Sequence, residues 1–232
     1  HRIPRDPLVW KVSAVMGVAL VVIGNGFVTW AEQWVPSNQA ALIIASSALW
    51  MAWFGTFGPK GTPLSGWTKI GLAVGFAGVG LLMLPGATGE SGLLIPMLAI
   101  LGSSMAWCGG TIYGRNAGIG VPPLMFAACQ MLIGGGILTA WGIADGELQR
   151  VDWTSAGLIG LTYLTLIGSC LAYGTYMWLI RHTTPARLAT VAYVNPVVAT
   201  VLGWWVLGET LAGLQLVGMA VILVGVVMVG RK

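Results

Sequence analysis

Charged residues are scarce in this chain. Only 18 of its 232 residues are Asp, Glu, Lys or Arg, a share of 8% against about 25% in an average soluble protein. A helix of about 20 apolar residues crosses a bilayer core about 30 Å thick, and a charge at its centre costs roughly 3 kcal/mol of insertion free energy. Eight stretches of 20 to 29 residues contain no charge: 12–31, 33–59, 70–89, 91–114, 116–144, 153–180, 188–208 and 210–230. The sequence therefore predicts an all-α integral membrane protein with eight transmembrane helices and no soluble domain.

Histidine and cysteine are also rare. His1 and His182 lie outside the predicted spans, and Cys108, Cys129 and Cys170 each stand alone in a different span. This is neither a metal-ligand spacing nor a disulfide framework. The sequence contains no Gly-x-Ser-x-Gly or His-Glu-x-x-His motif and no Gly-x-x-x-x-Gly-Lys-Ser/Thr phosphate loop. We therefore expect no enzyme activity, no metal and no cofactor. The basic residues form no cluster, so we expect no nucleic-acid partner.

The basic residues predict how the chain is oriented. With eight spans in alternation, ten of the eleven Lys and Arg residues fall on one side of the membrane and only Arg150 on the other. By the positive-inside rule the side with ten is cytoplasmic. We therefore expect both termini of the chain in the cytoplasm, and the protein in the plasma membrane, or in the inner membrane of a Gram-negative bacterium.

An internal repeat is visible. Residues 35–40, which open the second span, resemble residues 184–189, which open the seventh. The third and eighth spans share a pattern in which Leu64, Gly66, Gly71, Ala73, Gly78 and Val79 match Leu211, Gly213, Gly218, Ala220, Gly225 and Val226. Spans five helices apart cross the membrane in opposite directions, and inverted repeats are typical of alternating-access transporters.

The motifs resemble a known family. Gly24-Asn25-Gly26, Trp30-Ala31-Glu32-Gln33, Asn195-Pro196-Val197 and Leu207-Gly208-Glu209 are similar to motifs of EamA-type transporters of the drug/metabolite transporter superfamily. The resemblance implies ten helices in two inverted repeats of five, and export of amino acids, other metabolites or drugs. Residues 1–88 would be the last three helices of the first repeat and residues 89–232 the second repeat, so two helices are expected to precede the chain. Ser47 occupies the position in the first repeat that Pro196 occupies in the second.

Polar and aromatic residues inside the spans are the candidates for a substrate pathway. In span 153–180, Thr165, Ser169, Tyr173 and Tyr176 share one helical face, because their spacings of 4, 4 and 3 follow the helical period. Such residues favour an aqueous cavity or the bundle interior, although interhelical hydrogen bonds or an interfacial aromatic belt would explain them equally. The other candidates are Asn25, Thr29, Trp30, Ser104, Trp107, Thr111 and Tyr193.

Three further residues have alternative interpretations. Glu32 lies near the outer end of its span and could exchange protons, pair with a cationic substrate or simply face water. Pro196 lies inside a span, where it would bend the helix either as a hinge or as a static kink. Glu209 precedes the last helix, which favours a capping role.

The resulting hypothesis is a secondary transporter in contact with the lipid bilayer, a small-molecule substrate and, as a further expectation, protons. A channel or a non-catalytic membrane subunit remains the alternative.

Overall fold

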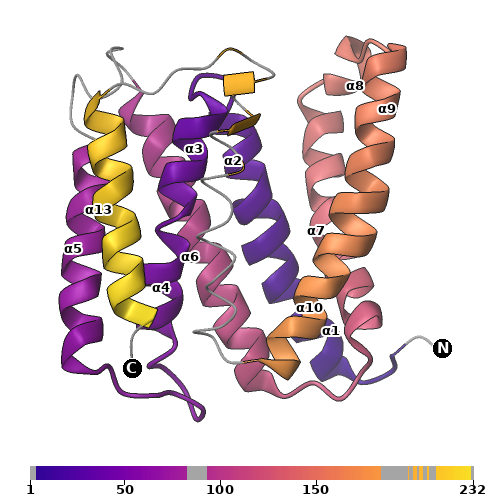
Figure 1. The fold of residues 1–232 in the computed structure, drawn as a ribbon. Coiled ribbons are helices and arrows are strands. Elements are labelled where there is room, and N and C mark those ends of the chain that lie inside the picture. The colour runs from indigo at the N-terminus through magenta and orange to yellow at the C-terminus, as the bar shows by residue number, and fades with distance from the viewer. Residues whose placement is uncertain are drawn as a thin grey trace.

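The computed structural model describes residues 4–82, 93–183 and 213–230, together with residues 198, 201, 202, 204, 205 and 208. Its described elements are all helical (Figure 1). The first helix begins at Pro7, whose fixed φ suits a first helical position, and the Asp6 carboxylate caps it by accepting from the Leu8 amide at 2.8 Å. It continues to Ala31 through three segments: α1 (Pro7–Met16), the π-helical η1 (Gly17–Asn25) and α2 (Gly26–Ala31).

The second predicted span, 33–59, differs from the prediction because it is not one continuous helix. It consists of α3 (Ser37–Ile44) and α4 (Ser47–Phe54). Between them the backbone tightens, since the Ser46 amide donates to the Ile43 carbonyl at 3.0 Å and the Ala48 amide to the Ala45 carbonyl at 3.3 Å. These are 3₁₀-type bonds to the third preceding residue, a local winding that interrupts an α-helix.

The other described helices overlap predicted spans, except α8, which lies in the predicted loop between spans 116–144 and 153–180. Gly118, in the left-handed conformation with φ 62°, ends α6, and Thr154 caps α9 by accepting from the Gly157 amide at 3.1 Å. The segments α9, η2 and α10 form one continuous helix with a π-helical middle. The bounds are α5 (Gly66–Leu82), α6 (Leu94–Ala117), α7 (Pro123–Ala144), α8 (Glu147–Arg150), α9 (Ser155–Tyr163), η2 (Leu164–Tyr173), α10 (Gly174–His182) and α13 (Gly213–Gly230).

Within the described residues, four helices are long and apolar enough to cross a membrane: Pro7–Ala31, Leu94–Ala117, Pro123–Ala144 and Ser155–His182. The helix Gly66–Leu82 and the segment Leu216–Val229 are apolar but shorter. Most of the predicted span 188–208 lies outside the described residues. The prediction of a helical membrane protein is therefore confirmed, whereas the number of eight spans and the arrangement in two repeats of five stay predictions.

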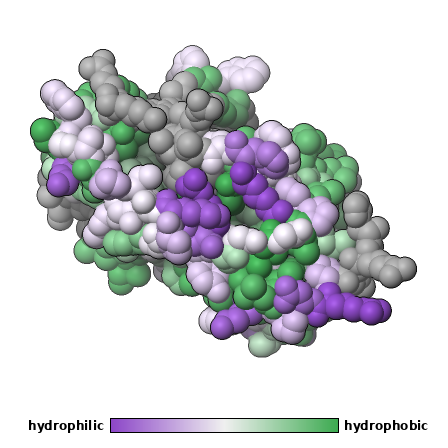
Figure 2. All heavy atoms as spheres, turned by 90° about the horizontal axis from the view of Figure 1, so that it is seen from below, coloured by the Kyte–Doolittle hydropathy of each residue, from purple (hydrophilic) through white to green (hydrophobic). Residues whose placement is uncertain are grey.

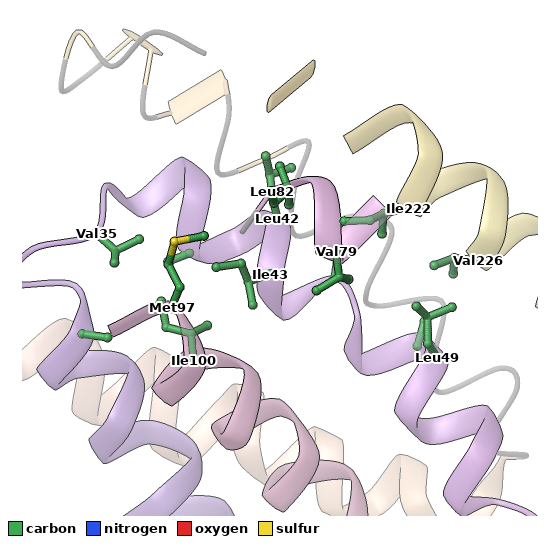
Figure 3. Packing of buried hydrophobic residues seen from close by; sticks show 14 of the residues in the cluster. Val35, Leu42, Ile43, Leu49, Val79, Leu82, Met97, Ile100, Ile222 and Val226 are labelled. Carbon is green, nitrogen blue, oxygen red and sulfur yellow. The ribbon is translucent and has the colours of Figure 1, made fainter. Parts of the chain in front are cut away.

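Two apolar clusters hold the bundle together. One joins α3, α4, α5, the start of α6 and α13, and Figure 3 shows Ile43, Leu49, Val79 and Ile222 converging in it. The other joins α1, η1, α4, α6, α7 and α10 around Met16, Leu20, Cys108, Phe126 and Met177. Helices α4 and α6 contribute to both clusters and connect the two halves of the described bundle.

Helices α5 and α13 pack closely through glycines. A Cβ atom on Gly71 would lie 2.8 Å from the Gly225 carbonyl oxygen, and one on Gly78 would lie 3.0 Å from the Gly218 carbonyl oxygen. The sequence repeat matches Gly71 with Gly218 and Gly78 with Gly225, so the contacts are reciprocal. Such reciprocity is what a two-fold axis between two helices would produce.

Basic residues gather at one end of the bundle, where α1 begins and α6, α10 and α13 end (Figure 1). Arg115 and Arg181 lie in the last turns of α6 and α10. Lys60 joins them there, since its ammonium group donates to the Arg115 carbonyl oxygen at 3.1 Å. Figure 2 views this end and shows hydrophilic groups around a hydrophobic patch. We call it the basic end. The opposite end, which carries Asp145, Glu147 and Asp152 in and beside α8, is the acidic end. The assignment of the basic end to the cytoplasm stays a prediction.

Candidate transport site

The Trp107 indole is the centre of a hydrogen-bonded contact between two helices. Its Nε1 donates to the Tyr176 hydroxyl oxygen of α10 at 2.8 Å, and the Thr111 hydroxyl, one turn along α6, lies 2.9 Å from the same oxygen. The Trp107 ring is tilted against the Tyr176 ring with a centroid distance of 5.4 Å. It also meets the Tyr173 ring edge to face, at 6.1 Å. The structure therefore brings Trp107, Tyr173 and Tyr176 together, from two predicted spans.

A second pair of contacts links the continuous helix formed by η2 and α10 to α7. The Tyr173 hydroxyl donates to the Gln130 Oε1 atom at 2.7 Å, and the Gln130 Nε2 atom lies 3.4 Å from the Met177 sulfur. Gln130 is fully buried and Tyr173 is 5% exposed, whereas Trp107 and Tyr176 are half-buried. We call Trp107, Thr111, Gln130, Tyr173 and Tyr176 the buried polar cluster.

Sequence analysis missed Gln130. The available signal was an amide side chain inside the uncharged stretch 116–144, since an uncharged polar group in a membrane span needs a hydrogen-bonding partner. Its partner could not be read from the sequence, because 43 residues separate it from Tyr173.

Gly24 determines where the Trp107 indole sits. A Cβ atom on Gly24 would lie 2.9 Å from the Trp107 Cε3 atom, which is closer than van der Waals contact allows. A glycine at position 24, the next-to-last residue of η1, therefore lets the Trp107 indole of α6 lie directly against the η1 backbone. The first glycine of the Gly24-Asn25-Gly26 motif thus has a packing role beside the buried polar cluster.

The candidates of the first helix lie beyond Gly24 toward the acidic end. Asn25, Thr29, Trp30 and Glu32 are all exposed in the described structure. Trp30, which is 43% exposed, packs edge to face against Trp34 with ring centroids 4.8 Å apart. The structure does not bring these four side chains into the buried polar cluster.

The candidates of span 153–180 divide into two groups. Tyr173 and Tyr176 belong to the buried polar cluster, whereas Thr165 is exposed and donates to the Leu161 carbonyl of its own helix at 2.8 Å. Ser169 is half-buried between the two groups. Ser104, on α6, is buried and donates to the Ile100 carbonyl at 3.2 Å, so its hydroxyl is satisfied within its own helix.

The remaining predicted residues, Tyr193, Pro196 and Glu209, lie outside the described residues. The position that matches Pro196 in the first repeat is Ser47, the first residue of α4 after the 3₁₀ interruption.

A cavity of about 290 Å³ lies on the basic-end side of the buried polar cluster. Met177, which contacts Gln130, is one of its lining residues. The cavity is lined by Met16, Lys60, Gly114, Arg115, Gly118, Ile119, Phe126, Met177, Ile180 and Arg181. Its walls thus combine apolar side chains with cationic residues from three parts of the chain. Among the described residues, no group of three or more His, Cys, Asp or Glu side chains is placed to bind a metal.

The fold and this site define a multi-pass helical membrane protein with a polar cluster buried between its helices. Residues 94–231 match the model of the EamA-like transporter family, which is more than half of the chain, and the chain belongs to this family. The predicted relationship to EamA-type transporters of the drug/metabolite superfamily is therefore confirmed.

Several curated proteins are similar in sequence. The uncharacterized inner membrane transporter YedA of Escherichia coli K12 is 38% identical over 202 residues, which are 86% of this chain and 64% of YedA. The uncharacterized transporter YvbV of Bacillus subtilis is 23% identical over 87% of this chain and 66% of its own length. A WAT1-related chloroplastic protein of Arabidopsis thaliana is 27% identical over 90% of this chain and 52% of its own length. The chain thus spans just under two thirds of YedA.

One crystal structure has a similar fold. It covers 95% of this chain and 84% of its own chain with a TM-score of 0.54 and 19% sequence identity. At this identity the similarity concerns the fold alone.

Proposed function

We propose that this chain is part of a secondary transporter that exports small metabolites, amino acids or drugs across the plasma membrane by alternating access. The observation that carries this proposal is the position of the buried polar cluster. It separates two polar regions, the exposed candidate residues toward the acidic end and the cationic cavity toward the basic end.

The exposed candidates diverge from the cluster along two helices. From Gly24, which contacts Trp107, the first helix continues through Asn25 to Thr29. From Tyr173, η2 continues in the reverse chain direction through Ser169 to Thr165. Both sets of side chains therefore rise from the cluster toward the acidic end, and they are suited to contact a polar solute on that side.

In this proposal the cluster is the closed barrier of one transport state. A solute passing from one side to the other would have to break the Trp107–Tyr176 and Tyr173–Gln130 hydrogen bonds. In membrane proteins such interhelical bonds contribute about 0.6 kcal/mol on average and up to about 1.7 kcal/mol. Bonds of this strength hold a conformation without making the alternative inaccessible, as a carrier requires.

Repeat-related features support alternating access. A shift of 149 residues, which places residues 35–40 on residues 184–189, carries η1 onto residues 166–174, almost the same residues as η2. The first and sixth spans thus have π-helical windings at matching places, and π-helical turns are frequent at functional sites. Together with the reciprocal α5–α13 contact, they favour two inverted repeats that exchange conformations, as alternating access requires.

A flux experiment tests the proposal. Cells that express the natural full-length protein are screened for metabolites whose internal level falls, and a solute found in this way is loaded into proteoliposomes. A carrier is expected to show saturable flux that unlabelled solute on the opposite side accelerates, because each reorientation then carries a solute back. Flux that rises linearly with concentration and shows no such acceleration would instead indicate a channel.

A further inference from the structure

We propose that the cavity at the basic end is a binding site for an anionic group, a phosphate or a carboxylate. Lys60, Arg115 and Arg181 line it, from the loop after α4, the end of α6 and the end of α10. The proposal rests on how these cations are held, on the size and lining of the cavity and on the absence of a carboxylate among the described residues that line it.

Two of the cations are held by neutral groups. The Lys60 ammonium donates to the Arg115 carbonyl oxygen at 3.1 Å, and the Arg181 guanidinium donates to the Val121 carbonyl oxygen. Arg181 also lies over the Phe126 ring, 5.6 Å from its centroid. An ammonium has three N–H donors and a guanidinium five, so donors remain for a ligand after these bonds are made.

No carboxylate lines the cavity among the described residues. The ion pair that the structure shows in its described part, Arg150–Asp145 at 3.1 Å, lies at the opposite end of the bundle beside α8. Three like charges that line one cavity repel one another, and an anion bound between them would remove this repulsion. Cations at helix C-termini also interact favourably with the last carbonyls, but that role requires no shared cavity.

The size and lining of the cavity restrict the ligand. About 290 Å³ is at the lower limit of small-molecule sites, which fits an anionic head group with a short apolar neighbour. Met16, Phe126 and Ile180 supply apolar walls for that neighbour. A phosphate or carboxylate at the end of a transported solute has this chemistry, and so has the head group of an anionic lipid. Binding of a transported solute rests on the proposed function, whereas binding of a lipid head group does not.

Binding to the purified full-length protein tests the site without a transport measurement. The melting temperature is followed by tryptophan fluorescence during three separate titrations at constant ionic strength. The probes are inorganic phosphate, acetate, and phosphatidylglycerol compared with phosphatidylcholine. We expect at least one anion to raise the melting temperature of the natural protein. Arg115→Gln and Lys60→Gln should each weaken its apparent affinity about tenfold, as loss of one charge-assisted hydrogen bond does.

Lys69→Gln is the matched control, because Lys69 is an exposed cation near the start of α5, at the same end, but does not line the cavity. Its removal changes the net charge equally and should leave binding unchanged. Stabilisation by phosphate or acetate would identify a soluble anion as ligand, and stabilisation by phosphatidylglycerol alone would identify a lipid head group. The proposal is wrong if none of these anions stabilises the protein, or if Lys69→Gln weakens binding as much as Arg115→Gln and Lys60→Gln.

Discussion

The contact between α5 and α13 provides a sharp test of the fold, because Gly225 has no room for a side chain. A Cβ atom there would lie 2.4 Å from the Gly75 nitrogen, 2.5 Å from its Cα and 2.7 Å from the Gly71 carbonyl oxygen. All three are backbone atoms, so no side chain can rotate away. To restore 3.4 Å, the lower limit of ordinary contact, the helices must separate by about 1 Å at this point. Overpacking of this kind costs about 1–3 kcal/mol.

Gly225→Ala should therefore lower the melting temperature of the purified full-length protein. One kcal/mol corresponds to about 2–4 °C in a protein of this size, so a fall of roughly 2–12 °C is expected in a detergent melting curve. Gly80→Ala is the matched control, because it adds the same methyl group to α5 at a place where no described atom outside the helix's own backbone lies within 4 Å. Its melting temperature should stay the same or rise, since alanine favours the helix. Equal losses in both variants, or no loss in Gly225→Ala, would refute the close packing of these helices.

Three further predictions concern the site and the orientation. Tyr176→Phe removes the hydroxyl that accepts from Trp107, so it should cost about 1 kcal/mol of stability and reduce transport several-fold. Leu171→Ala, at a side chain 62% exposed, should change transport little, and equal effects of the two variants would refute a role for the cluster. Thr62→Cys, in the loop between α4 and α5, should not react with an impermeant thiol reagent added outside intact cells, whereas Gln149→Cys, on α8, should react with it. The opposite labelling would reverse the predicted orientation. Glu32→Gln should lower transport or flatten its pH dependence at normal expression, because it removes a group able to exchange protons, and an unchanged pH profile would leave Glu32 only an interfacial role.

The class of protein follows from the sequence alone. Uncharged stretches of 20 or more residues have one favourable environment, the hydrocarbon core of a bilayer, and each must be helical there because its backbone groups have no water to bond. The reciprocal glycine contact of α5 and α13 also follows a visible repeat, since small residues at matching positions let two helices approach.

The buried polar cluster required the tertiary structure. Periodicity placed Thr165, Ser169, Tyr173 and Tyr176 on one face. In the structure Tyr173 is buried and Tyr176 half-buried in the cluster, whereas Thr165 is exposed, because the neighbours along a long helix change with depth. The same applies to Gln130, which gains its meaning from Tyr173 on another helix. The 3₁₀ interruption after Ile44 and the two π-helical segments left no mark in the hydrophobic pattern. They depend on how backbone bonds adjust to packing, and packing between distant segments is what a linear pattern does not contain.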